Sequence, residues 1–148
     1  MRIVAGRHKG RRLAAPGRGN AAARLRPTAD RLREALFNRL SHGAAGDRIS
    51  GARVLDLFAG TGALGLEALS RGAGRAVFVE SGRAARGLIA ANIAALDEAG
   101  RTRLIAGDVT RLGPAPEAEF DLIFADPPYG RGLGERALTR ALAGGWIA

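Results

Sequence analysis

Residues 54–65 of the chain read Val54-Leu55-Asp56-Leu57-Phe58-Ala59-Gly60-Thr61-Gly62-Ala63-Leu64-Gly65. The first five residues are apolar but for one acid, which predicts a strand buried on both faces. The glycines follow the spacing G-x-G-x-x-G, which predicts a tight turn that opens a helix. Glycines let the backbone approach a ligand closely, and a helix N-terminus offers unpaired N–H groups to an anion. The stretch therefore predicts an α/β domain with a ligand-binding loop at the end of a strand.

Strands and helices alternate through the rest of the chain. This order predicts a parallel sheet with right-handed crossovers and helices on both faces, as in Rossmann-like folds. After the first strand, further strands are expected at residues 76–80, 103–106 and 120–125, and helices at 63–71, 83–99 and 133–143. The packing face of the helix at 83–99 is expected to comprise Ala85, Leu88, Ile89, Asn92, Ile93 and Leu96.

The N-terminal region is strongly basic. The chain carries a formal charge of +9, and residues 1–29 hold eight of its Lys and Arg residues and no acid. Short strand candidates at 2–5 and 11–14 flank a turn-prone stretch at 6–10, which predicts a basic β-hairpin arm joined to the body by a flexible loop at 16–26. Such a segment suits a nucleic-acid backbone, because each phosphate contact releases counterions. An organism that favours arginine codons would also produce this charge.

A helix is expected to follow the arm. Pro27-Thr28 predicts its start, with Thr28 as the N-cap and Asp30 near the positive end of the helix dipole. The apolar stripe is predicted from the helical spacing of Leu32, Ala35, Leu36 and Leu40. The opposite face is expected to be solvated and carries Arg31, Arg33 and Arg39.

Composition excludes several classes of site. The chain has no cysteine, and its two histidines, His8 and His42, share no metal-ligand spacing, so we expect no disulfide and no metal. No apolar run is long enough to cross a bilayer, and the N-terminus lacks the apolar stretch of a signal peptide, so no membrane partner is expected. A chain of 148 residues with 47% hydrophobic residues predicts a single domain, here expected to be a cytoplasmic monomer.

Acids end three successive predicted strands. Asp56 lies in the first strand, Glu80 ends the second and Asp108 follows the third. Ligands of open parallel sheets bind at this carboxyl edge. A carboxylate at position 56 would repel a pyrophosphate but attract an ammonium group, which favours S-adenosylmethionine over NAD. Glu80 could then accept the ribose hydroxyls and Asp108 the adenine amine. The expected cofactor-binding residues are Asp56, Phe58, Gly60, Thr61, Gly62, Glu80 and Asp108.

The fourth strand runs into Asp126-Pro127-Pro128-Tyr129. Successive prolines have no N–H group and fix φ, so the turn presents carbonyl oxygens as rigid acceptors. The lone pair of an exocyclic base amine is conjugated with its ring and reacts poorly until both N–H bonds are held. We expect Asp126 and the Pro127 carbonyl to hold them, and Tyr129 to stack on the base, a contact worth about 1–3 kcal/mol. The predicted catalytic residues are Asp126, Pro127, Pro128 and Tyr129.

These motifs together resemble the bacterial 16S ribosomal RNA guanine-N2 methyltransferases, which are class I S-adenosylmethionine-dependent enzymes. The resemblance rests on residues 2–6, 26–28, 33–38, 56–68 and 126–129. It implies a class I methyltransferase fold, with residues 1–26 contacting RNA and 27–148 forming the methyltransferase domain. It also implies a guanine in a 16S hairpin loop as target, presented in a small-subunit assembly particle. The residues expected to contact RNA are Arg2, Arg7, Lys9, Arg11, Arg12, Arg26 and Thr28.

Other interpretations remain open on the sequence. The Asp-Pro-Pro-Tyr motif does not specify the base, so an adenine-N6 or cytosine-N4 methyltransferase of DNA or RNA is the main alternative. A nicotinamide-dependent oxidoreductase and a non-catalytic RNA-binding assembly protein are two more. The family pattern continues with further strands after the helix at 133–143. We therefore expect at least one βα unit, about 30 residues, to be missing, which would leave the strand ending at Ala125 at an exposed edge.

Overall fold

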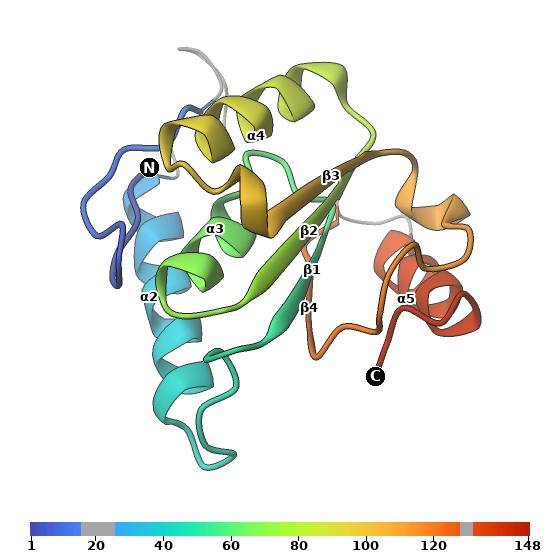
Figure 1. Ribbon diagram of the computed structural model, residues 1–148, viewed down its shortest axis with the longest axis horizontal. Coiled ribbons are helices and arrows are strands. Elements are labelled where there is room, and N and C mark those ends of the chain that lie inside the picture. The colour runs from blue at the N-terminus through green and yellow to red at the C-terminus, as the bar shows by residue number, and fades with distance from the viewer. Residues whose placement is uncertain (16–25, 128–131) are drawn as a thin grey trace.

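A parallel β-sheet forms the centre of the molecule (Figure 1). The computed structural model describes residues 1–15, 26–127 and 132–148, with side chains from residue 30 onward in the second range. The sheet has four strands in the order β3-β2-β1-β4, and all three pairings are parallel. This confirms the predicted sheet. Each strand lies within two residues of its expected bounds: β1 (Arg53–Leu57), β2 (Arg75–Glu80), β3 (Thr102–Ala106) and β4 (Leu122–Ala125).

Helices cover both faces of this sheet, as predicted. On one face lie α2 (Arg26–His42), α3 (Ala63–Ser70) and α4 (Arg83–Ala95), and on the other lies α5 (Leu133–Ala143) (Figure 1). Side chains alternate along β1, so that Val54 belongs to the core under the first three helices, while Leu55 and Leu57 belong to the core under α5. Each face of the sheet thus buries its own apolar layer, which is the main stabilising contribution to the fold.

The helix at 83–99 is shorter than expected. It ends at Ala95, and Asp97 then adopts a left-handed backbone conformation with φ of 55°. Because that conformation cannot continue a right-handed helix, the chain turns here and forms a short 3₁₀ helix, η1 (Ala99–Arg101), before β3. A second 3₁₀ helix, η2 (Val109–Arg111), follows β3.

The predicted apolar stripe of α2 is confirmed only at Leu40, which is partly buried against the core, and is wrong at its other three positions. Leu32 and Leu36 are 67% and 40% exposed, whereas Arg33 and Phe37 are 5% and 0% exposed. The ring of Phe37 packs 5.4 Å from that of Phe124 in β4, and Arg33 is neutralised by an acid of α3. The spacing of apolar residues could not reveal the buried face of α2, because one of its residues, Arg33, is a charged side chain that is buried with its ion-pair partner. Ala35 is exposed as well.

The start of α2 also differs from expectation. The helix begins at Arg26, so Thr28 lies within its first turn and is not the residue that precedes it. The predicted flexible loop lies outside the described residues, except for Arg26 at the start of α2.

The predicted hairpin arm is present in a short form. Arg2 and Arg12 pair in antiparallel register, the Ile3 N–H donates to the Arg11 carbonyl at 3.0 Å, and the Leu13 N–H donates to the Met1 carbonyl at 2.9 Å. Ile3 and Leu13 are 1% and 3% exposed and belong to the core shared with α3 and α4. The arm therefore packs on the body of the domain.

Residues after α5 return to the side of β4. Ile147 forms a parallel bridge with Phe120, whose N–H donates to the Trp146 carbonyl at 2.8 Å. The Trp146 ring stacks on that of Phe120 with centroids 6.1 Å apart. These contacts lie at the start of β4, and in the described part of the chain no further strand pairs with its remaining length. None of the described helices has the length and hydropathy needed to span a membrane.

Candidate active site

The glycine loop joins β1 to α3 through three residues with left-handed backbone. Phe58, Gly60 and Gly62 have φ of 57°, 61° and 81°. A bulky residue adopts this conformation at a cost of about 1–2 kcal/mol, and such strain is usually found where function requires it. The turn is closed by a 2.8 Å hydrogen bond from the Gly62 N–H to the Ala59 carbonyl. The loop therefore turns away from the sheet in a fixed shape.

The third glycine of the motif allows α3 to approach the sheet. A Cβ atom on Gly65 would lie 2.4 Å from a ring carbon of Phe78 in β2. Only glycine fits at this contact, so the helix N-terminus stays close to the strand ends.

Asp56 is the buried acid of the site. It is 1% exposed, and its Oδ2 accepts the Gly65 N–H at 3.0 Å. Burial foremost, together with the nearby charges of Asp126 and Glu80, raises the pKa of Asp56 to about 8, although the Gly65 hydrogen bond acts in the opposite direction. A cation at this place would reverse the effect and favour the carboxylate.

Glu80 holds the glycine loop to the end of β2. Its Oε1 accepts the Gly60 N–H and its Oε2 accepts the Gly82 N–H, both at 2.8 Å. Each carboxylate oxygen has a second lone pair, so Glu80 keeps acceptor capacity for a ligand hydroxyl.

Asp108 lies beyond the end of β3 and is exposed. Its Oδ1 accepts the hydroxyl and the N–H of Thr110, at 2.7 and 2.8 Å, so Asp108 caps η2. These bonds lower the pKa of Asp108 below its usual value. Asp108 is therefore an anion held in a fixed position. It follows β3, whereas Glu80 ends β2, the strand that lies between β3 and the strand of Asp56.

Asp126 follows β4 at the same edge of the sheet. Ala125 is in register with Leu57, which brings Asp126 beside the start of the glycine loop. Its charge acts on buried Asp56, although Asp126 itself is exposed. Asp56, Glu80 and Asp126 thus form an acidic cluster at the carboxyl ends of three adjacent strands. Pro127 is half-buried, and Pro128 and Tyr129 lie outside the described residues.

The basic residues of the arm divide into two groups. The side chains of Arg7, Lys9 and Arg12 are exposed and form no hydrogen bond or ion pair with the described residues. Arg2 instead donates to the Gly10 carbonyl at 3.0 Å, and Arg11 donates to the Ala95 carbonyl of α4 at 2.6 Å. The Arg2 hydrogen bond therefore stabilises the arm itself, and the Arg11 hydrogen bond fixes the arm to the body of the domain. The side chains of Arg26 and Thr28 lie outside the described part of α2.

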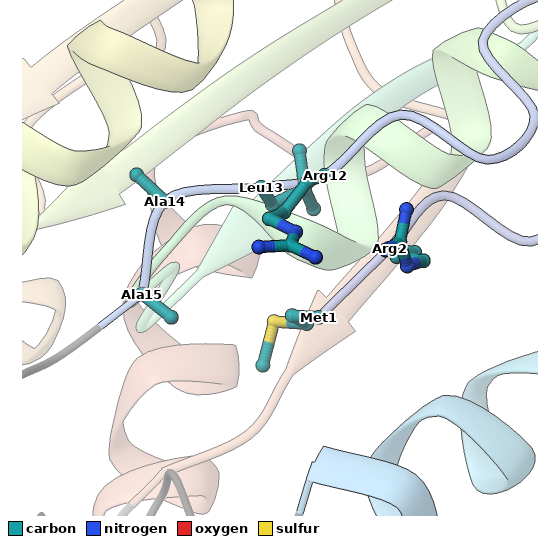
Figure 2. Close-up of a pocket in the computed structure, with 6 residues that line it drawn as sticks. All are labelled: Met1, Arg2, Arg12, Leu13, Ala14 and Ala15. Atoms are coloured by element: carbon teal, nitrogen blue, oxygen red, sulfur yellow. The ribbon is translucent and has the colours of Figure 1, made fainter. Parts of the chain in front are cut away.

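The open end of the arm borders the glycine loop. Met1 and Arg2 line one side and residues 12–15 the other side of a hollow of about 420 Å³ (Figure 2). The sulfur of Met1 lies 3.6 Å from the hydroxyl of Thr61. A ligand of the arm at this hollow would therefore be close to the glycine loop.

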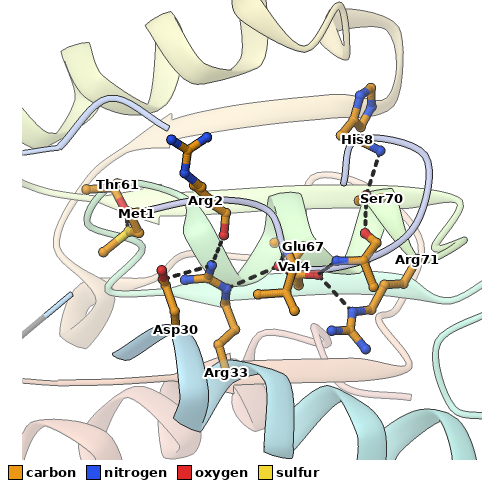
Figure 3. Close-up of polar contacts among 12 residues, drawn as sticks. Met1, Arg2, Val4, His8, Asp30, Arg33, Thr61, Glu67, Ser70 and Arg71 are labelled. Carbon is orange, nitrogen blue, oxygen red and sulfur yellow. Dashed lines mark hydrogen bonds and ion pairs between the residues drawn. The ribbon is translucent and has the colours of Figure 1, made fainter. Parts of the chain in front are cut away.

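Glu67 is the centre of a buried network that sequence reasoning missed (Figure 3). Fully buried in α3, it accepts the N–H groups of Val4 and Ala5 at 2.9 and 3.2 Å. It also pairs with Arg33 of α2 at 3.2 Å and with Arg71 at 2.8 Å. The signal was present in the sequence, because Glu67 is the only charged residue of the helix Ala63–Ser70.

Two further buried contacts hold the turn of the arm. The Ser70 hydroxyl accepts the His8 N–H at 2.9 Å and donates to the Ala5 carbonyl at 2.6 Å. The His8 ring lies 2.9 Å from a carboxylate oxygen of Glu98. Burial would raise the pKa of Glu98, but hydrogen bonds from Arg101 and His8 outweigh it and hold the pKa below the usual value.

The chain is similar to a family of known proteins along its whole length. The family model described as "Conserved hypothetical protein 95" matches residues 1–148. Ribosomal RNA small subunit methyltransferase D of Escherichia coli is 39% identical over 148 residues, which are all of this chain and 70% of that protein. The putative rRNA methyltransferase YlbH of Bacillus subtilis is 38% identical over 132 residues, which are 87% of this chain and 67% of that protein.

Solved structures give the same picture. The putative methyltransferase yhhF from Escherichia coli superposes with a TM-score of 0.80 at 36% identity, covering all of this chain and 75% of that one. A tRNA (uracil-54, C5)-methyltransferase of Pyrococcus abyssi shares the fold, with a TM-score of 0.58 at 19% identity over 79% of this chain and 26% of that one. These matches confirm the predicted methyltransferase fold and the resemblance drawn from the motifs.

Proposed function

Because this chain belongs to the ribosomal RNA small subunit methyltransferase D family, we propose that it methylates the exocyclic N2 amine of a guanine in 16S ribosomal RNA, with S-adenosylmethionine as methyl donor. The substrate would be a small-subunit assembly particle. The observation that carries the proposal is the acidic cluster beside the glycine loop, with the Asp126-Pro127 carbonyl turn at its rim.

The residues present fit this cofactor. Asp56 is buried beside two other acids, an arrangement that is unfavourable until a cation binds, and S-adenosylmethionine carries both an ammonium and a sulfonium group. The same cluster would repel the pyrophosphate of NAD. The carboxylate of S-adenosylmethionine suits the N-terminus of α3. Glu80 would accept hydrogen bonds from the ribose hydroxyls, and Asp108 would accept one from the adenine amine. Phe58, Gly60, Thr61 and Gly62 would line the cofactor.

Catalysis would depend on how the target amine is held. Bound S-adenosylmethionine supplies an electrophilic methyl group. Asp126 and the Pro127 carbonyl would each accept one N–H of the amine, which orients its nitrogen lone pair toward that methyl group. Pro128 would keep the turn rigid, and Tyr129 would stack on the base. The exposed position of Asp126 leaves it accessible to a base that enters from solvent.

The arm would supply contacts that do not depend on base sequence. Arg7, Lys9 and Arg12 have exposed guanidinium or ammonium groups that no described residue neutralises, and such groups are suited to phosphates. Arg2, Arg11, Arg26 and Thr28 would contribute further contacts to the RNA. Residues 1–26 would thus bind RNA, and residues 27–148 would form the methyltransferase domain.

The test is methyl transfer by the purified chain. Small-subunit particles and free 16S rRNA from a strain that lacks the gene would be incubated with S-adenosylmethionine and digested to nucleosides for mass spectrometry. We expect N2-methylguanosine, more of it from particles than from free RNA, and none from naked DNA. N6-methyladenosine or N4-methylcytidine would support the alternative bases. Binding of RNA without any turnover would support an assembly protein.

A further inference from the structure

Asn92 of α4 joins the arm to the glycine loop. It is 1% exposed, although it is polar. Its Nδ2 donates to the Thr61 carbonyl of the loop at 2.9 Å and to the Ala14 carbonyl of the arm at 3.1 Å. Its Oδ1 accepts the Ala14 N–H at 2.6 Å. One side chain therefore binds two segments that lie far apart in the sequence.

The chemistry of these partners admits few other residues. Two are carbonyls, which only accept, and the third is an N–H group, which only donates. A primary amide of this length provides two donors and one acceptor, whereas a carboxylate provides no donor. Burial makes an unsatisfied hydrogen-bonding group costly, so the pairing of Asn92 with these three partners is strongly favoured.

A second contact holds Thr61 from the other strand of the arm. The Met1 sulfur lies 3.6 Å from the Thr61 hydroxyl, and the Met1 carbonyl accepts the Leu13 N–H at 2.9 Å. Met1 and Ala14 are thus at the paired open end of the hairpin. Thr61 is held by both, directly by Met1 and through Asn92 by Ala14.

We infer that Asn92 is a positioning residue that couples RNA contact by the arm to cofactor binding at the glycine loop. RNA bound to the exposed charges of the docked arm would stabilise the position of Ala14 and, through Asn92, the position of the Thr61 carbonyl in the loop. Coupling between two binding sites is reciprocal, so RNA and cofactor each raise the affinity for the other by the same factor. This inference rests on the proposed function.

The coupling factor can be measured in the full chain by calorimetry. S-adenosylhomocysteine would be titrated with and without a saturating 16S rRNA transcript, for the wild type, Asn92→Asp and Asn92→Leu. We expect RNA to tighten S-adenosylhomocysteine binding about fivefold or more in the wild type, within the usual range of such couplings. Both variants should lose this factor, because neither can donate to Thr61 and Ala14.

Ser70→Ala is the matched control. It removes two hydrogen bonds between the arm and the body but touches neither Thr61 nor Asn92, so it should keep the coupling factor. If the Asn92 variants do not fold, hydrogen exchange of residues 60–66 in the wild type replaces them, and added RNA should slow it. Wild-type coupling in a folded Asn92 variant, no coupling in the wild type, or no protection of the loop would overturn the inference. Failure of the wild type to bind either probe would overturn the proposed function with it.

Discussion

The carboxylate of Glu67 in α3 lies 3.2 Å from Nε of Arg33 in α2, and the two side chains are 0% and 4% exposed. The same carboxylate accepts two backbone N–H groups of the arm. This pair therefore connects the arm, α2 and the helix that starts at the glycine loop. A buried ion pair adds little net stability by itself, but loss of one partner leaves the other charge buried without compensation.

We predict that Glu67→Gln lowers the free energy of unfolding by about 3 kcal/mol, because it removes the buried negative charge that Arg33 and Arg71 share, although Arg33 keeps its ion pair with Asp30. Urea denaturation monitored by circular dichroism measures this. Glu34→Gln, on the exposed face of α2, is the control and should change the unfolding free energy by less than about 0.5 kcal/mol. Equal effects of the two changes would show that the buried network is not what holds these segments.

We predict that the exposed charges of the arm contribute to the salt dependence of RNA binding. Replacing Arg7, Lys9 and Arg12 by glutamine should weaken binding and reduce the slope of log affinity against log salt by about 2–3, because three phosphate contacts are lost. Filter binding at several salt concentrations measures the slope. Arg11→Gln should act mainly through arm packing, since Arg11 donates to the Ala95 carbonyl. An unchanged slope in the triple variant would count against the arm as the RNA contact.

Cofactor binding should release a proton from Asp56. Its pKa is about 8 before binding, so the group is mostly protonated at pH 7, and a bound ammonium group favours the carboxylate. Titration of S-adenosylhomocysteine in buffers of different ionisation enthalpy measures the release, which we expect to approach one proton at pH 6–7. Asp56→Asn should bind more weakly and release none.

The same pKa shift should make the unfolding free energy of the cofactor-free protein depend on pH. The folded pKa of Asp56 lies above its ordinary value of 3.8, so its contribution to stability is complete below pH 3.8 and is lost as pH rises through about 8. Asp56→Asn should flatten this fall in unfolding free energy. A variant that retains the wild-type pH dependence would contradict the assignment.

Glu117 should stabilise the amino ends of β1 and β2 in a pH-dependent way. It accepts from Arg75 at 2.9 Å and from Arg53 at 2.8 Å, and these partners, Arg75 foremost, lower the pKa of Glu117 to about 2. Its stabilisation is therefore present above pH 4.5 and disappears as pH falls through 2. Glu117→Gln should cost about 1–2 kcal/mol at pH 7 and nothing near pH 2, as measured by thermal unfolding. A cost independent of pH would point to packing instead.

Patterns that depend on backbone periodicity predicted the fold well. The strands at 54–58 and 76–80 were predictable because buried parallel strands are continuous apolar runs, and the helix at 133–143 because its apolar spacing is regular. The positions of Asp56, Glu80 and Asp126 at one edge followed from the parallel topology.

Partnerships between distant polar residues could not be predicted in this way. Arg33 was expected in solvent but is buried with its ion-pair partner Glu67. This burial could not be predicted, because Glu67 lies 34 residues away in another helix. Asn92 was assigned to a packing face, which is correct, but its three hydrogen bonds depend on where the arm docks. Such contacts require the tertiary structure.

The most direct test of the central claim compares Asp126→Ala with the wild type in two measurements on the same preparation, methyl transfer to small-subunit particles and affinity for S-adenosylhomocysteine. If Asp126 holds the target amine, methyl transfer falls by about 100-fold or more while cofactor affinity stays within a few-fold. A parallel loss of both, or full activity of the variant, would contradict the account.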